Sequence, residues 1–214
     1  MKKESGSQII LGLEIPRKYN TAGGKMQIGD KIVFDRYEWR ILDIQNNTAL
    51  IITEDIVEQR AYHNIYKDTT WNGCEIRKYL NSEFYDKFDD TNKSRISQVL
   101  NKNPDNPWYG TKAGGEGQDC IFLLSPEEVC RYFGDSTEKL QNRGNNRYWK
   151  KNDENNSKRM AKLRGVYYWW WLRSPGRNNH LAVYVHGTDG CIGLNGNNVT
   201  NCNGGIRPAL WLKL

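Results

Sequence analysis

The sequence contains no long apolar run. In residues 1–18 the apolar stretch is broken by Gly12 and Glu14, whereas the core of a signal peptide needs about 7–15 apolar residues. No later run approaches the ~20 residues of a membrane-spanning helix. We therefore expect no signal peptide and no membrane span. A chain made in the cytoplasm would then reach an outside target in a virion or by another export route.

Cysteine pairs and metal-binding spacings are absent too. The five cysteines form no CxxC pair and fit no zinc spacing, and their odd number favours a reducing compartment over a complete disulfide framework. Only Cys191 and Cys202 would pair, if their loops met. The three histidines match no recognised zinc arrangement either; they are His63, His180 and His186. We expect no metal and no other cofactor.

The fingerprints of common enzyme classes are also missing. The chain has no GxSxG elbow, P-loop, HExxH helix or dinucleotide-binding glycine motif. Each of these motifs places a nucleophile, a phosphate or a zinc ion in a defined local structure. We therefore predict that the protein is not an enzyme.

The composition that remains is that of a folded domain. Hydrophobic residues make up 37% of the chain and the mean hydropathy is −0.82. Eight Trp and twelve Tyr nevertheless supply large buried areas, and a disordered chain would be poor in aromatic residues. At 214 residues, one core is a better interpretation than two.

The net charge of +6, from 31 basic and 25 acidic residues, is modest and spread along the chain. Proteins that bind nucleic acid usually gather Lys and Arg into a patch. The densest basic group, residues 143–164, is diluted by Asn and acidic residues, which favours a solvated surface. A nucleic-acid-binding module using residues 143–164 stays open as the alternative.

Short β-rich runs near both ends of the chain predict a sheet. Residues 32–34, 39–44 and 48–53 predict three strands separated by turns. The C-terminal part predicts four more, at residues 167–174, 181–187, 190–195 and 206–214. We expect an α+β domain in which strands from both ends share a sheet.

The middle of the chain predicts helices. Ile76, Leu80, Phe84 and Phe88 have helical spacing within residues 70–88, and Thr70 or Asn72 is a candidate N-cap. Residues 89–101 predict a second short helix, and residues 120–125 a buried strand. A third helix starts at Pro126, with Ser125 as N-cap and Glu128 completing a capping box. Residues 134–165 predict a loop with one helical piece.

Six ordered motifs resemble a family of bacterial and phage domains, DUF6273. They are GDKIVFDRYEWRILDI, ALIITEDIVEQRAYHN, TWNGCEIRKYLNSEFYDKF, IFLLSPEEVCRYF, WWLRSPG and GGIRPALWL. The tail is also similar to C-type-lectin-fold variable proteins that retroelements diversify. The resemblance implies an α+β, C-type-lectin-like fold with short mixed or antiparallel sheets, two or three helices and long loops. It divides the chain into an N-terminal polar segment, 1–25, and one domain, 26–214.

Five residue types are missing from residues 177–205, which we name the variable segment. Lys, Glu, Gln, Met and Trp do not occur there, although they make up about a quarter of the rest of the chain. Diversity-generating retroelements randomise the adenines of Asn codons, and with a pyrimidine third base those five types cannot be reached. Ordinary loop composition is the competing explanation, because turns favour Asn and Gly.

Within the variable segment, Gly190, Ile192, Gly196, Val199 and the strand LAVYV, apart from the outward-facing Tyr184, would form an unchanging framework. Arg173 and Arg207 flank the segment, and we interpret them as buried hydrogen-bond anchors for loop carbonyls. The candidate ligand-binding residues are Arg177, Asn178, Asn179, His180, Tyr184, His186, Thr188, Asp189, Cys191, Leu194, Asn195, Asn201, Cys202 and Asn203.

The resemblance and the residue usage together predict a non-catalytic ligand-recognition protein. Its partner would be a protein or glycan on a cell or virion surface, which Asn and Tyr side chains contact adaptably, as they do in antibody loops. Nucleic-acid binding is the first alternative. An enzyme related to the formylglycine-generating fold is the second, since that fold uses cysteines near its C-terminus, where Cys191 and Cys202 lie.

Overall fold

The computed structural model describes residues 25–134, 137–146, 148 and 154–214. The predicted N-terminal polar segment, residues 1–25, therefore lies outside the described residues except for Lys25. Among the described residues, no helix is long and apolar enough to cross a membrane. The fold is of mixed α+β type and consists mainly of sheets.

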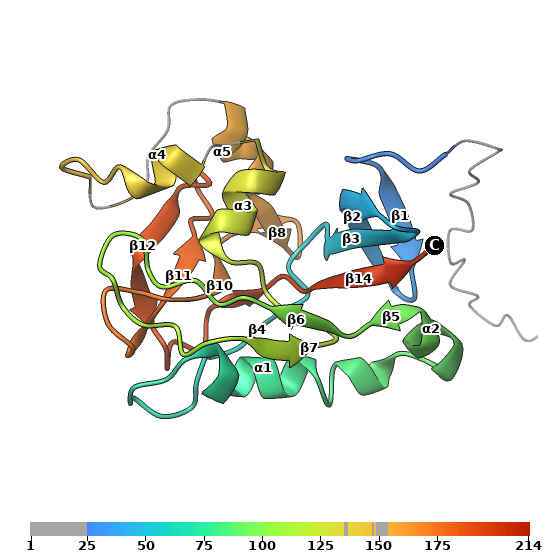
Figure 1. The fold of residues 1–214 in the computed structure, drawn as a ribbon, viewed down its shortest axis with the longest axis horizontal. Helices are drawn as coiled ribbons and strands as arrows, with labels where there is room; N and C mark the ends of the chain where they lie inside the picture. Colours follow the sequence, from blue (N-terminus) through green and yellow to red (C-terminus); the bar gives the residue numbers. More distant parts are fainter. Residues whose placement is uncertain (1–24, 135–136, 147, 149–153) are drawn as a thin grey trace, which may run out of the picture.

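The first sheet joins the two ends of the domain. Its five strands have the order β1-β2-β3-β14-β5, and β14 pairs antiparallel with β3 from Ala209↔Ile52 to Lys213↔Thr48. This confirms that strands from both ends share a sheet (Figure 1). The strands are β1 (Lys31–Phe34), β2 (Tyr37–Gln45), β3 (Thr48–Thr53), β5 (Ile96–Ser97) and β14 (Ala209–Lys213).

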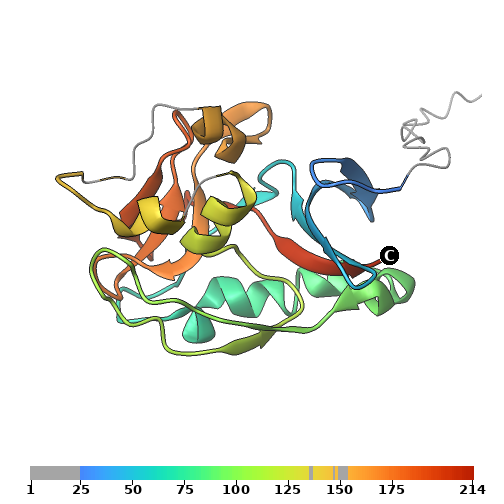
Figure 2. The same cartoon turned by 45° about the horizontal axis from the view of Figure 1, so that its top comes forward.

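The second sheet contains the variable segment. It also has five strands, in the order β12-β11-β10-β13-β4, and lies at the other end of the molecule from β1 and β2 (Figures 1 and 2). Two-stranded sheets pair β6 (Val99–Asn101) with β7 (Gly117–Asp119), and β8 (Ala161–Leu163) with β9 (Val166–Tyr168). The strands of the second sheet are β4 (Glu58–Gln59), β10 (Trp170–Pro175), β11 (Leu181–Val185), β12 (Ile192–Asn198) and β13 (Gly205–Ile206).

The described helices are short and more numerous than the two or three expected. They comprise α1 (Glu75–Leu80), α2 (Asp90–Arg95), α3 (Pro126–Tyr132), α4 (Thr137–Gln141) and α5 (Glu154–Arg159), with 3-10 turns η1 (Trp71–Gly73) and η2 (Tyr85–Lys87). The start of α3 confirms the predicted capping box of Ser125 and Glu128. Residues 89–101 form α2 followed by β5 and β6, so only their first half is helical.

The single helix predicted over residues 70–88 is wrong, because Asn81 ends it. Its side chain accepts hydrogen bonds from the backbone N–H groups of Cys120 and Ile121 and donates to the Ile121 carbonyl at 2.9 Å. The first N-cap candidate, Thr70, makes no side-chain cap, and α1 begins after Cys74. The other candidate, Asn72, instead donates to loop carbonyls that include Glu116.

The buried strand predicted at residues 120–125 is also wrong. The segment is buried, but only Phe122 makes a β-bridge, to Ala209. Most neighbouring peptide groups bond to side chains: Asn81 accepts from Cys120 and Ile121, and Arg173 donates to the Leu123 carbonyl at 2.8 Å. The Leu124 carbonyl accepts from the Arg173 backbone N–H at 3.0 Å. An apolar run predicts burial correctly here but not the partner of its backbone.

Arg173 connects β10 to three other parts of the chain. Its side chain is only 2% exposed, and its Nε, Nη1 and Nη2 atoms donate to Asn103 Oδ1, the Leu123 carbonyl and the Lys102 carbonyl. Both Nη atoms also donate to the carboxylate of Glu128. The prediction that Arg173 anchors loop carbonyls is confirmed.

We expect Glu128→Ala to lower the free energy of unfolding by about 3 kcal/mol, because it leaves a buried guanidinium without its counter-ion and opens the capping box of α3. The adjacent Glu127 is exposed, so Glu127→Ala is a matched control with an expected change below about 0.5 kcal/mol. Urea unfolding of both variants measures the difference. Equal losses would show that the pairing with Arg173 contributes nothing.

Candidate ligand-binding surface

The variable segment forms two strands and the loops at their ends. β11 and β12 pair antiparallel, with Leu181↔Asn198 at one end and Val185↔Ile192 at the other. The loop before β11 and the loop after β12 therefore lie at the same end, and the loop of residues 186–191 lies at the opposite end. This arrangement distributes the candidate residues over both ends of the second sheet.

Most candidate side chains reach the surface. Arg177, Asn178, Thr188, Asp189, Cys202 and Asn203 are exposed, and Asn179, His180, Tyr184, His186, Asn195 and Asn201 are half-buried. Two candidates are corrected. Leu194 is 0% exposed and belongs to the hydrophobic core, while Cys191 is 3% exposed, with its Sγ 3.7 Å from Asn156 Nδ2 of α5. Neither side chain is accessible to a macromolecular ligand.

His180 forms a cluster with a loop far away in sequence. Its Nδ1 lies 3.0 Å from Asp68 Oδ1, and its ring centroid is 4.6 Å from that of Tyr66. Beside it, Asn179 donates to the Lys112 carbonyl at 2.9 Å. Asn179, Asp68 and Lys112 line a cavity of about 410 Å3. One end of the surface therefore combines the variable segment with residues 65–70.

Tyr184 and His186 form a second, aromatic cluster. The Tyr184 ring lies 5.0 Å from His186 and 5.5 Å from Trp169, and Tyr148 packs against His186 at 4.6 Å. Tyr184 lies across the neighbouring strand at Gly193, where an added Cβ would be 2.4 Å from the Tyr184 ring. Gly193 is therefore required for this position of the Tyr184 ring.

Residues 201–203 form a third group, in the loop between β12 and β13. Asn201 Oδ1 accepts from the Asn203 backbone N–H at 3.0 Å, which stabilises a tight turn. Gln59 of β4 donates to the Asn203 carbonyl at 3.1 Å. The exposed Cys202 lies at this turn, whereas Cys191 lies just before β12. All five cysteines are free.

The backbone of the variable segment is held by groups outside it. Asn106 donates to the Leu194 carbonyl at 2.8 Å, and Arg159 donates to the Gly190 carbonyl at 2.7 Å. The backbone N–H of His63 donates to the Val199 carbonyl at 2.8 Å. Because these bonds involve backbone atoms of the segment, they hold its conformation whatever its exposed side chains are. Asn178, Asp189 and Asn201 add bonds of their own, since each accepts from a nearby backbone N–H group.

The two ends of the surface are too far apart for a small ligand to bridge. Six residue steps separate His180 from His186, which at ~3.3 Å per step along a strand is roughly 20 Å. A partner that contacts both clusters must therefore have macromolecular dimensions. Among the described residues, no group of three or more His, Cys, Asp or Glu side chains is placed to hold a metal ion.

Sequence reasoning missed the residues that the fold brings to the variable segment. Ile65 and Tyr66, both 60% exposed, lie with Asp68 in a loop that the prediction did not connect with residues 177–180. Tyr148, half-buried beside His186, was placed only within the basic region. The adjacent apolar pair at 65–66 in a polar loop was the only local signal.

His63 is a buried histidine that lies just before the loop of residues 65–70. Its side chain is 4% exposed, and neither ring nitrogen has a hydrogen-bond partner among the described residues. Burial, with the charge of Lys67, lowers the pKa of His63 below its usual value of 6.5. The folded state therefore favours the neutral form of the His63 imidazole.

The comparisons with known proteins give one match. A family model described as "Domain of unknown function (DUF6273)" matches residues 46–214. The first motif, residues 29–44, lies outside that range. No curated protein and no solved structure matches the chain.

The surface residues should tolerate change where the buried candidate does not. We expect Arg177→Ser, Thr188→Tyr and Asn203→Tyr each to change the free energy of unfolding by at most about 0.5 kcal/mol, because the side chains are exposed. Leu194→Ala should cost about 2–5 kcal/mol through the cavity that it leaves. Chemical denaturation of the four variants tests this, and similar losses in all four would contradict the division.

Stability should fall as the pH is lowered through about 6.5, in part because of His63. The unfolded state takes up the proton at its ordinary pKa of about 6.5, whereas the folded state resists it, so the unfolded state gains protons first. His63→Phe should make this loss smaller between pH 7.5 and 5.5 in urea unfolding. A variant that loses as much stability as the wild type would show that His63 is not responsible.

Proposed function

We propose, from the premise that the chain belongs to the DUF6273 family, that it is a non-catalytic ligand-recognition protein. Its ligand is a protein or glycan on the surface of a cell or virion. The ligand-binding surface consists of the accessible side chains of the variable segment. The residues that fold against them, Tyr66 and Asp68 at one end and Tyr148 at the other, complete it.

The observation that carries the proposal is that groups outside the variable segment hold its backbone, while most of its candidate side chains remain accessible. Buried groups outside it hold its carbonyls, while twelve of its fourteen candidate side chains are exposed or half-buried. That is what a protein needs in order to change its ligand without losing its fold. The absence of five residue types from the same stretch is the second support.

We further propose that the fold is C-type-lectin-like and that a retroelement diversifies the variable segment. The pairing of β3 with β14 supports the fold assignment. So does the position of the segment in the second sheet, between WWLRSPG and GGIRPALWL. The distance between its two clusters supports a macromolecular ligand, and the Asn and Tyr side chains supply adaptable polar and aromatic contacts.

The two alternatives receive less support. The basic segment 143–164 falls partly outside the described residues, and no observation there favours nucleic-acid binding. For an enzyme of the formylglycine-generating type, Cys191 and Cys202 would have to act together, but one is buried and the other is exposed in a different loop.

Sequencing the DNA around the gene tests the proposal. We expect a near-copy of the stretch that encodes residues 177–203, close to a reverse-transcriptase gene. Differences between the copies should fall at template adenines, with AAC or AAT opposite the codons of His180, His186 and Asp189. Codons for the buried Val183 and Val185 should match, because the scaffold must stay fixed while exposed contacts vary.

A neighbourhood without such a copy, or differences scattered over all four bases, would contradict diversification. The codons of Cys191 and Leu194 provide an internal comparison. If the template carries Asn codons at these buried positions as often as at exposed ones, accessibility does not govern which residues vary.

A further inference from the structure

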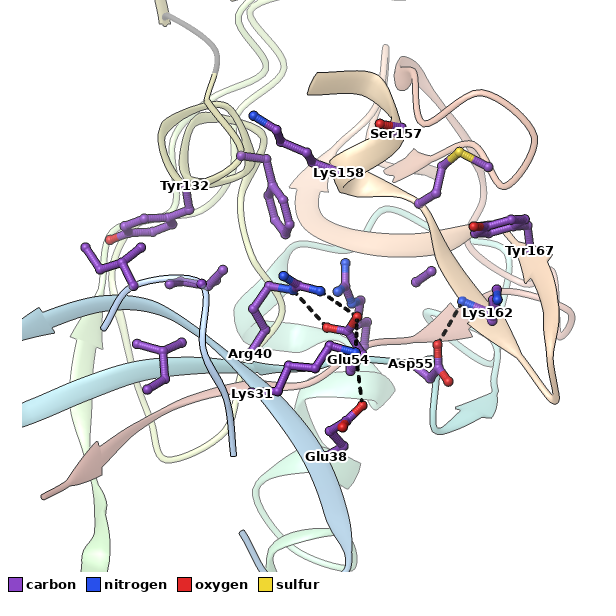
Figure 3. A pocket seen from close by; sticks show the side chains of 18 residues that line it. Lys31, Glu38, Arg40, Glu54, Asp55, Tyr132, Ser157, Lys158, Lys162 and Tyr167 are labelled. Carbon is purple, nitrogen blue, oxygen red and sulfur yellow. Dashed lines mark hydrogen bonds and ion pairs between the residues drawn. The ribbon is translucent and has the colours of Figure 1, made fainter. Parts of the chain in front are cut away.

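A second cavity lies away from the variable segment. It has a volume of about 510 Å3, and no residue of 177–205 lines it. Figure 3 shows Lys31 and Arg40 of the first sheet, with Glu54 just after β3, on one side, and Ser157 and Lys158 of α5 on the other. This volume is within the range of pockets that bind small molecules.

Arg207 lines this cavity with most of its hydrogen-bonding capacity unused. The side chain is 1% exposed, and Nε donates to the Thr53 carbonyl at 2.8 Å. Among the described residues, nothing accepts a hydrogen bond from Nη1 or Nη2. A guanidinium has five N–H donors, so one of the five is satisfied, whereas the equally buried Arg173 has partners on all three nitrogens.

Two of the three carboxylates that line the cavity are paired with other cations, and the third, Asp55, accepts from the Lys162 backbone N–H at 3.3 Å. Glu54 accepts from Arg40 Nε and Nη2 at 2.8 and 2.6 Å and lies 3.2 Å from Lys31 Nζ. Glu38 lies 3.4 Å from the same ammonium group. Among the described residues, no carboxylate lies within 4.0 Å of Arg207. Burial lowers the pKa of Arg207 to about 10, so the side chain is still charged at neutral pH.

The rest of the cavity wall combines basic groups with apolar and aromatic ones. Lys162 brings another ammonium group, with its Nζ 5.1 Å from the centre of the Tyr167 ring, whereas Lys158 Nζ donates to Asn155 Oδ1 at 3.0 Å. Ile41, Leu42 and Met160 supply an apolar wall. The guanidinium of Arg207 itself lies 5.1 Å from the centre of the Trp170 ring and 5.6 Å from that of the Phe133 ring.

We propose that this cavity binds a small-molecule oxyanion, a carboxylate or phosphate monoester joined to an apolar body, through the free Nη1 and Nη2 edge of Arg207. Two parallel N–H···O bonds match the planar guanidinium to either oxyanion. Lys162 adds positive charge to the cavity wall, and the apolar wall receives the body of the ligand. Binding supplies the acceptors that a buried, charged guanidinium otherwise lacks.

Calorimetric titration of the purified chain with simple probes tests this site. We expect saturable one-to-one binding of phenyl phosphate or benzoate, and the stronger of the two identifies which oxyanion fits. Inorganic phosphate should bind more weakly because it lacks the body, and benzyl alcohol should not bind because it lacks the charge. Bound probe should also raise the melting temperature.

Variants locate the site. Arg207→Gln should weaken binding of the preferred probe at least tenfold, and Lys162→Gln should weaken it several-fold. Lys93→Gln is the matched control: it removes the same charge from α2, where Lys93 pairs with Asp86 at 3.0 Å, and should leave binding unchanged. If Arg207→Gln does not fold, Lys162→Gln against Lys93→Gln decides.

Two outcomes would overturn the proposal: no saturable binding of any anionic probe at about 10 mM, which would mean that the cavity holds water alone, or equal weakening by Lys93→Gln. The test is independent of the proposed function. His180→Ser alters the ligand-binding surface and should leave probe binding unchanged, because His180 does not line this cavity.

Discussion

The arrangement of the domain depends on the hydrogen bonds and the ion pair of the buried Arg173 guanidinium. It stands on β10, immediately before the variable segment, and binds residues 102–103, the Leu123 carbonyl and Glu128 of α3. Placing a charge inside a protein costs free energy unless it is paired and hydrogen-bonded. The position of β10 therefore requires that the loop, the buried segment 120–125 and α3 are all in place.

From β10 the same principle extends through the second sheet to the surface. Asn106 binds the carbonyls of Pro175 and Leu194, and Arg159 binds that of Gly190, where an added Cβ would lie 1.8 Å from the Asn156 carbonyl oxygen. Polar side chains inside the molecule thus fix the path of the backbone, and apolar ones fill the space around it. Some accessible side chains also shape the loops, since Asn178, Asp189 and Asn201 accept backbone hydrogen bonds. Exposed side chains without such bonds can differ at little cost in stability.

Arg173 and Arg207 flank the variable segment and were interpreted alike, as anchors of loop carbonyls. Each does hold a carbonyl, Leu123 and Thr53 respectively. They differ in how many N–H donors lack an acceptor. All three nitrogens of Arg173 donate hydrogen bonds, whereas Arg207 directs unbonded N–H groups at a cavity. The sequence cannot distinguish a fully hydrogen-bonded guanidinium from a partly bonded one, because the acceptors come from distant parts of the chain.

The sequence by itself determined what depends on neighbouring residues: the strands β1 to β3, the capping box at Ser125 and Glu128, and the stretch from which five residue types are missing. Only the tertiary structure decided that Asn81 ends α1 in order to bind Cys120 and Ile121, that Leu194 and Cys191 face inward, and that Tyr66 and Asp68 join His180. Periodicity and capping act over a few residues, so they can be read along the chain. Burial and pairing depend on contacts between residues about 40 to more than 100 positions apart, which exist only after the sheets have formed.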